Sequence, residues 1–155
     1  MRLAGGRSVE YDKLLLTTGA RVRKLPVPGA DLPGVFYLRD FDDTKAIRAR
    51  LAPGVRAVVI GGGFIGLETA ASATKRGAAV TVLEAADRLM GRAVAPEIGS
   101  WFAAMHRKKG VDVRLSARIA AIAGAGKVER VVLAGGEPVP ADIVVIGIGI
   151  VPNVE

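Results

Sequence analysis

The glycine-rich stretch between residues 58 and 84 constrains the fold of this chain more than any other feature. The apolar run 58–60 has the composition of a buried strand, and a second apolar run, 80–83, ends in Glu84. Between the two runs stand three glycines in the spacing G-x-G-x-x-G: Gly61, Gly63 and Gly66. Strand, glycine turn, helix and second strand in this order predict a βαβ unit with a parallel sheet.

Each glycine of this motif has a physical role in holding a dinucleotide. Gly61 allows the tight turn from strand to helix, Gly63 lets the backbone approach a pyrophosphate, and Gly66 lets the helix pack closely on the strand. The helix that starts here directs unpaired N–H groups and a positive dipole end at the phosphates. The sequence therefore predicts an NAD(H) site, and the alternative is that these glycines only serve packing.

Glu84 lies where an acid of this motif accepts a hydrogen bond from the ribose 2′-hydroxyl, about 20 residues after the glycines. Its charge favours NAD over NADP, because a carboxylate repels a 2′-phosphate. Arg88 and Arg92 leave NADP open, since an arginine can accommodate that phosphate. The alternative for Glu84 is an ordinary surface acid at a strand end.

The composition fits one α/β domain, with 155 residues of which 50% are apolar. There is no cysteine, and no apolar run approaches the roughly 18 residues needed to span a bilayer. We therefore expect no membrane partner, and a cytoplasmic protein. The net charge of +7 comes from scattered basic residues, which favours a solvated surface or an acidic protein partner over nucleic acid.

Periodicity and turn residues predict the remaining elements. The segment 21–34, rich in Pro and Gly, is expected to be a linker or an ordered loop. Asp43 or Thr44 is expected to cap a helix that ends near Leu51. The other expected helices are 64–76 and 96–109, and the expected strands are 2–4, 7–11, 13–17, 57–60, 79–84, 111–115, 119–122, 128–133 and 143–148.

These elements predict a Rossmann-like α/β fold with a parallel sheet, plus a small antiparallel β element made of the first three strands. Three short strands cannot easily bury a face of their own. We therefore expect this sequence to be a piece of a larger protein.

Four segments of the chain resemble one family, the FAD-dependent pyridine nucleotide-disulphide oxidoreductases. Within it they resemble the ferredoxin reductase branch, the flavoproteins that serve putidaredoxin, rubredoxin or ferredoxins of ring dioxygenases. The segment 87–114, with its R-x-x-x-P-E, F-x-x-x-H and G-V-D-x-R, is the most branch-specific. The other three are 11–21, which ends in a T-G motif, 61–68, which reads GGGFIGLE, and 141–153.

The resemblance implies that NADH passes a hydride to FAD and that electrons then go to a ferredoxin- or rubredoxin-type acceptor. The family's first G-x-G-x-x-G and its later G-D motif, both for FAD, are not among these residues. We therefore expect 1–40 to be a remnant of the FAD-binding domain, 41–150 to be the NAD-binding domain and 151–155 to start the return to the FAD domain. FAD would be bound in the full-length parent, and the isolated chain would be inactive.

Two other functions remain open at this stage. The chain could be a stand-alone module that binds NAD(H) without catalysis. It could also be a fragment of another branch, such as an NADH oxidase or a nitrite reductase.

The resemblance also implies roles for individual residues. Arg92 reaches the adenosine ribose, and Glu68 faces the nicotinamide end or merely complements the dipole of its helix. Phe64 and Ile65 pass under the pyrophosphate and the nicotinamide ribose, with core packing as their alternative. Together with the T-G motif and two glycines after the last strand, the candidate cofactor-binding residues are Thr18, Gly19, Gly61, Gly63, Phe64, Ile65, Gly66, Glu68, Glu84, Arg92, Gly147 and Gly149.

No catalytic or metal-ligating set is predicted. His106 is the only histidine, and it lies on a helix with the apolar spacing of a packed face. A structural or surface role is therefore expected for it, since hydride transfer to a flavin needs no protein acid.

Overall fold

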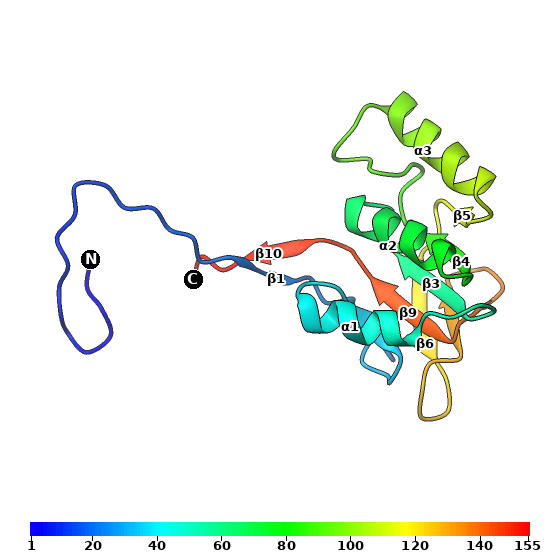
Figure 1. The fold of residues 1–155 in the computed structure, drawn as a ribbon, viewed down its shortest axis with the longest axis horizontal. Helices are drawn as coiled ribbons and strands as arrows, with labels where there is room; N and C mark the ends of the chain where they lie inside the picture. Colours follow the sequence, from blue (N-terminus) through cyan, green and yellow to red (C-terminus); the bar gives the residue numbers. More distant parts are fainter.

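The computed structural model describes residues 1–155, which form a layered α/β body with an extended arm (Figure 1). The middle layer is a five-stranded parallel sheet in the order β2-β9-β3-β4-β5. Its strands are β2 (Val35–Tyr37), β9 (Ile143–Ile146), β3 (Arg56–Ile60), β4 (Ala79–Leu83) and β5 (Asp112–Arg114). The Rossmann-like fold class that the sequence predicted is confirmed.

Both faces of this sheet are buried, because successive residues of its central strands enter two different cores. Val59 and Val145 pack with three helices, α1 (Phe41–Arg50), α2 (Phe64–Lys75) and α3 (Pro96–Lys108). Val58 and Val144 pack on the other face, against residues of an antiparallel sheet. That sheet consists of β6 (Ile119–Ala123), β7 (Arg130–Leu133) and β8 (Val139–Pro140). The molecule therefore has three layers, and the two-residue β8 is an element that the sequence did not predict.

Helix α1 starts earlier than the sequence predicted. Asp40, rather than Asp43 or Thr44, is the N-cap, and its side chain accepts a hydrogen bond of 2.9 Å from the Asp43 amide. The Asp43 carboxylate accepts in turn from the Asp40 amide, at 3.1 Å. The two acids form a reciprocal capping box. Asp43, which was expected to be the N-cap, is instead the N3 residue of this box.

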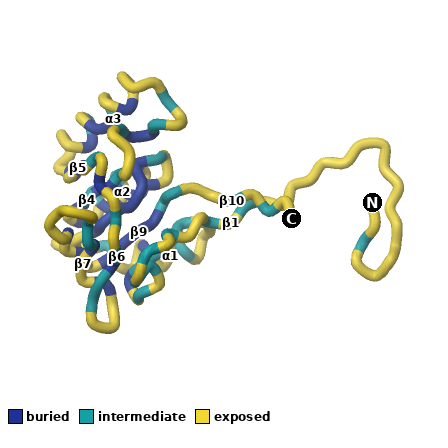
Figure 2. Tube along the Cα trace, turned by 180° about the vertical axis from the view of Figure 1, so that it is seen from behind, coloured by how far each residue is buried: buried dark blue, intermediate teal, exposed yellow.

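The expected strand at 13–17 is wrong, and the expected strands at 2–4 and 7–11 are reduced to one bridge, between Arg2 and Ser8. The segment is extended and exposed, as the burial colours of Figure 2 show, and 84% of Leu15 is accessible to solvent. A strand exists only with a partner, and this apolar run has none in the chain.

Residues 20–22 join the arm to the body through a pairing that the sequence did not predict. β1 (Ala20–Val22) pairs antiparallel with β10 (Ile150–Pro152), which follows the last strand of the sheet. The Asn153 amide donates to the Gly19 carbonyl, and its side chain donates to the Thr18 carbonyl. The T-G motif is thereby held in the arm, beside the end of β10, by residues from the far end of the sequence.

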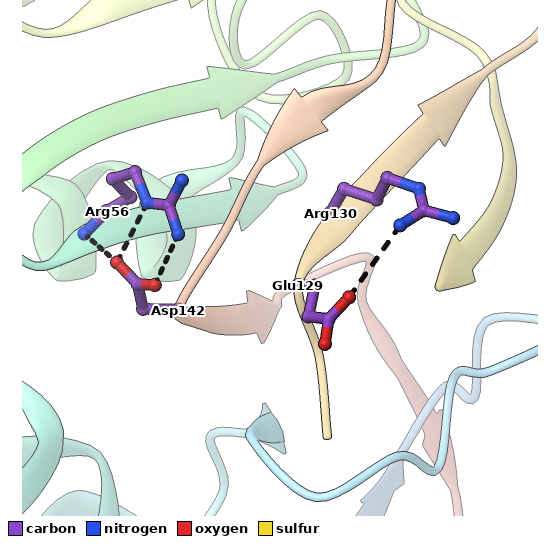
Figure 3. A network of polar contacts seen from close by, with 4 residues as sticks. All are labelled: Arg56, Glu129, Arg130 and Asp142. Carbon is purple, nitrogen blue, oxygen red and sulfur yellow. Dashed lines mark hydrogen bonds and ion pairs between the residues drawn. The ribbon is translucent and has the colours of Figure 1, made fainter. Parts of the chain in front are cut away.

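An ion pair joins β3 and β9 at the amino ends of these two strands (Figure 3). The Arg56 guanidinium donates to both oxygens of Asp142, at 2.9 and 2.6 Å, and the Arg56 amide donates to the same carboxylate at 2.9 Å. The side-chain hydrogen bond to Arg56 lowers the pKa of Asp142 from 3.8 to about 2. The folded state is therefore stabilised by the ionised carboxylate.

We expect Asp142→Asn to remove part of the acid sensitivity of folding. Because the Asp142 pKa is lower in the folded protein, its stabilisation is complete above about pH 4 and is lost as the pH falls towards 2. Both side chains are about half exposed, so the contribution should stay below about 1 kcal/mol. Urea unfolding at pH 6 and at pH 2.5 should show a smaller difference for the variant than for the wild type.

The comparison between the two proteins also cancels other acid effects. Burial lowers the pKa of His106, so protonation of this histidine destabilises both proteins alike. Equal losses of stability on acidification in variant and wild type would contradict the role given to Asp142.

None of the three helices is long and apolar enough to cross a membrane.

Candidate functional site

The glycine turn lies at the point where the order of the parallel sheet reverses. The chain proceeds from β3 to β4 and β5 on one side, whereas β9 and β2 lie on the other side of β3. Gly61 follows β3 and Gly147 follows β9, and the Gly147 amide donates to the Ile60 carbonyl at 2.8 Å. In open α/β sheets, ligands bind at such a reversal, beyond the carboxyl ends of the strands.

Two glycines of the motif are required by the backbone itself. Gly61 has a φ of +110°, and a Cβ on it would collide with the Gly147 carbonyl. A Cβ on Gly66 would collide with the Gly61 carbonyl and would also touch the Val59 side chain, at 3.4 Å. The first glycine thus permits the turn and the third permits α2 to lie against β3, as the spacing of the motif predicts.

Gly63 is different, because nothing lies within 4 Å of where its Cβ would be. It is the N-cap of α2, with no side chain to satisfy the first turn, and that turn contains no acidic residue. The amides of Gly63, Phe64 and Ile65 donate to no acceptor in the chain. Three free N–H groups at the positive end of a helix dipole, with open space before them, suit a phosphate or pyrophosphate.

Glu84 follows β4 and is held against this turn by two backbone amides. One carboxylate oxygen accepts from Gly62 at 2.6 Å, and the other accepts from Ala86 at 2.8 Å. Each carboxylate oxygen can accept a second hydrogen bond, so the group can still receive the hydroxyls of a ribose. The acid is therefore fixed in orientation before any ligand arrives.

The loop after β4 closes over the glycine turn. The Met90 amide donates to the Gly62 carbonyl at 2.9 Å, and Met90 itself has a φ of 49°. Arg88 donates to the carbonyls of Gly91 and Val94, so it fastens its own loop. Of the two arginines that the sequence left open for a 2′-phosphate, only Arg92 lines the same cavity as the glycine turn and Glu84.

A cavity of about 710 Å³ brings most of the predicted residues together. The predicted residues that line it are Gly61, Gly63, Phe64, Ile65, Glu84, Arg92, Gly147 and Gly149. Gly66 is buried beneath the turn, and Thr18 and Gly19 lie in the arm beyond the cavity. Glu68 lines a separate cavity of about 520 Å³ between α1 and α2, which Ile65 shares with it.

Sequence reasoning missed two walls of the larger cavity. One is Leu25, Pro26 and Val27, from the segment expected to be a linker, and the other is 117–119, at the start of β6. Their composition does not identify them as binding residues. They lie at the site because they pack with the antiparallel sheet, the third layer of the fold. The Ala117 amide donates to the Glu84 carbonyl at 2.8 Å, which fastens the second wall beside the acid.

His106 is buried, with 5% of its surface exposed, and it does not line either cavity. No group of three His, Cys, Asp or Glu residues is arranged to hold a metal ion.

The sequence model of the pyridine nucleotide-disulphide oxidoreductases matches residues 2–155. The chain belongs to this family. It is 47% identical to rhodocoxin reductase of Rhodococcus erythropolis over 100% of its own length and 36% of the relative's. It is 42% identical to the ferredoxin–NAD(+) reductase component of the biphenyl dioxygenase system of Paraburkholderia xenovorans, again over 100% of its length and 38% of the relative's.

The similarity extends to three dimensions. Putidaredoxin reductase, solved in a covalent complex with putidaredoxin, superposes with a TM-score of 0.88 at 40% identity. The match covers 98% of this chain and 38% of that protein. The resemblance seen in the sequence is therefore confirmed, and the chain spans less than two fifths of the length of these relatives.

Proposed function

We propose that this chain is the NAD(H)-binding domain of an FAD-dependent ferredoxin- or rubredoxin-type reductase. The observation that carries the proposal is the open N-terminus of α2 beside Glu84, at the reversal of the parallel sheet. Free amides suit the pyrophosphate of a dinucleotide, and a fixed carboxylate beside them suits its adenosine ribose.

The remaining cavity residues would contact different parts of such a dinucleotide, from its adenosine end to its nicotinamide end. Arg92 would contact the adenosine end with Glu84, and the exposed side chains of Phe64 and Ile65 would lie along the pyrophosphate and the second ribose. Gly147 and Gly149 would allow close approach at the end of β9. Glu68 would lie at the nicotinamide end, next to Ile65. The nicotinamide supplies the hydride, so these residues only bind and orient it.

The rest of the reaction belongs to the parent protein in this proposal. The parent would hold FAD, which accepts the hydride, and an iron–sulfur protein would take the electrons. Support comes from the relatives, which are named reductases of ferredoxin and rhodocoxin, and from the structure with putidaredoxin. We keep 1–40, 41–150 and 151–155 as the proposed division, although the pairing of β2 with β9 favours a first boundary before residue 35.

A titration of the isolated chain with NADH tests the binding role. We expect one NADH per chain, with weaker binding of NADPH because Glu84 opposes a second negative charge on the ribose. In Glu84→Ala the preference for NADH over NADPH should narrow, because the ribose loses its acceptor and the 2′-phosphate loses its repulsion. Calorimetric titration with both nucleotides measures the ratio, and an absence of NADH binding to the wild type would reject the proposal.

The visible absorption spectrum separates the reductase from the stand-alone module. No flavin should remain on the chain after FAD is added and free ligand is removed, because the FAD motifs of the family are not among these residues. A retained flavin that bleaches on addition of NADH would instead show a chain that is active alone.

A further inference from the structure

The adenosine end of the larger cavity contains a second arginine, Arg118, that belongs to no motif of the sequence. Arg92 and Arg118 both line the cavity that contains Glu84. Neither guanidinium forms an ion pair or donates a hydrogen bond within the chain, in contrast to Arg88, which binds two carbonyls of its own loop. Two guanidinium groups without a partner in the chain therefore lie in the same cavity as the Glu84 carboxylate, and the cavity lining has a net charge of about +1.

Arg118 reaches this position from a different element than Arg92. It follows Ala117, whose amide donates to the Glu84 carbonyl, so the backbone of Arg118 is fastened next to the acid. Its own carbonyl accepts from the Ala134 amide at 2.9 Å, directly beside the pairing of β6 with β7. The backbone is thus fixed by the fold, while the side chain is exposed and free to turn towards a ligand.

Glu84 is less repulsive to an anion than a free carboxylate at this position would be. Both of its oxygens already accept from amides, of Gly62 and of Ala86, and these N–H dipoles offset part of the charge. The Glu84 carboxylate also points towards the glycine turn, because one of its oxygens is bonded to the Gly62 amide. A doubly charged phosphate on the neighbouring ribose would meet the two guanidinium groups as well as this acid.

We propose that Arg118 is a second determinant of coenzyme choice, which acts with Arg92 to hold the adenosine 2′-phosphate and lets the site accept NADPH beside NADH. The inference rests on the proposed NAD(H)-binding function. Glu84 sets the preference for NADH, and Arg118 limits the size of that preference. A guanidinium presents a planar fork of donors that matches a phosphate, so Arg118 favours the phosphorylated ribose over the unmodified one.

Calorimetric titration of Arg118→Ala with NADH and with NADPH tests this role. We expect the NADPH affinity to fall about tenfold and the NADH affinity to change less than about twofold, because a charge-assisted bond to a phosphate is lost only for NADPH. The matched control is Arg114→Ala, which removes a nearby arginine that is paired with Asp112 and does not line the cavity. The control should leave the ratio of the two affinities unchanged.

The dependence on salt supplies a readout that a purely structural role would not change. In the wild type, NADPH affinity should fall more steeply than NADH affinity as ionic strength rises, since the extra contact is between charges. This difference in slope should shrink in Arg118→Ala and return in Arg118→Lys, which keeps the charge. Thermal unfolding of each variant should match the wild type, because the Arg118 side chain makes no polar contact in the chain.

The outcomes separate the two proposals. If NADH does not bind to the wild type, the proposed function fails and this inference fails with it. If NADH binds but NADPH does not, or if Arg118→Ala leaves the affinity ratio and the salt slopes unchanged, the NAD(H) site stands and the role of Arg118 is overturned.

Discussion

Gly63→Val is expected to abolish NADH binding while the chain remains folded. Nothing lies within 4 Å of the position of the new Cβ, so the side chain fills only the space in front of the α2 amides. A φ of −82° with a ψ of −177° is extended backbone, which valine adopts without strain. The loss of two charge-assisted hydrogen bonds from the pyrophosphate, at about 1.5–3 kcal/mol each, corresponds to at least 100-fold in affinity.

The measurement is a pair of assays on the same protein, NADH titration and urea unfolding. The fold should lose no more than about 1 kcal/mol, which is the cost of replacing a glycine N-cap by an apolar residue. Gly63→Ala adds one methyl group and should give an intermediate affinity. Unchanged NADH affinity in Gly63→Val would mean that the pyrophosphate does not lie on these amides, and the proposed site would be rejected.

The centre of the fold could be predicted because its signals are local. The expected strand at 57–60 and the expected helix at 64–76 agree with β3 and α2 to within a residue or two, since an apolar run and a glycine turn lie next to each other in the sequence. The same holds for the expected helix at 96–109, which has a proline at its first position and a glycine after its end. Here short-range patterns and the final packing agree.

The errors lie where an element depends on a distant partner. The apolar run at 13–17 has the composition of a strand but meets no second strand, whereas the three residues of β1 pair with β10 at the far end of the sequence. β2 was missed for the same reason, because it exists only as the neighbour of β9. Pairings between strands that are far apart in the sequence cannot be predicted from a short window of residues.

The site shows the same division. The spacing of the motif led to Glu84, and the structure adds that Gly62 and Ala86 hold its carboxylate. Arg118 could not be found in this way, since the third layer of the fold brings it to the cavity and no motif contains it. A motif identifies the residues that the turn requires, and the residues that modify specificity come from the layers around it.

Gly66→Ala should destabilise the fold, although the substitution of alanine for glycine inside a helix ordinarily stabilises by about 0.5–1 kcal/mol. The sign reverses here because the new methyl group would overlap the Gly61 carbonyl, which is backbone and cannot turn aside. Relief requires α2 to move away from β3, where Leu67 and Ala70 are packed in the core. Overpacking of this kind costs about 1–3 kcal/mol, and the contact with backbone favours the upper end.

Urea unfolding measures this effect, with Gly63→Ala as the matched control from the same motif. A loss of about 3 kcal/mol should lower the urea midpoint by about 1–2 M, whereas the control should stay within about 1 kcal/mol of the wild type. The two variants would then assign separate roles to two glycines that the motif treats alike, one to packing and one to the ligand. A Gly66→Ala protein as stable as the wild type would show that α2 can shift at little cost, and would remove close packing as the reason for this glycine.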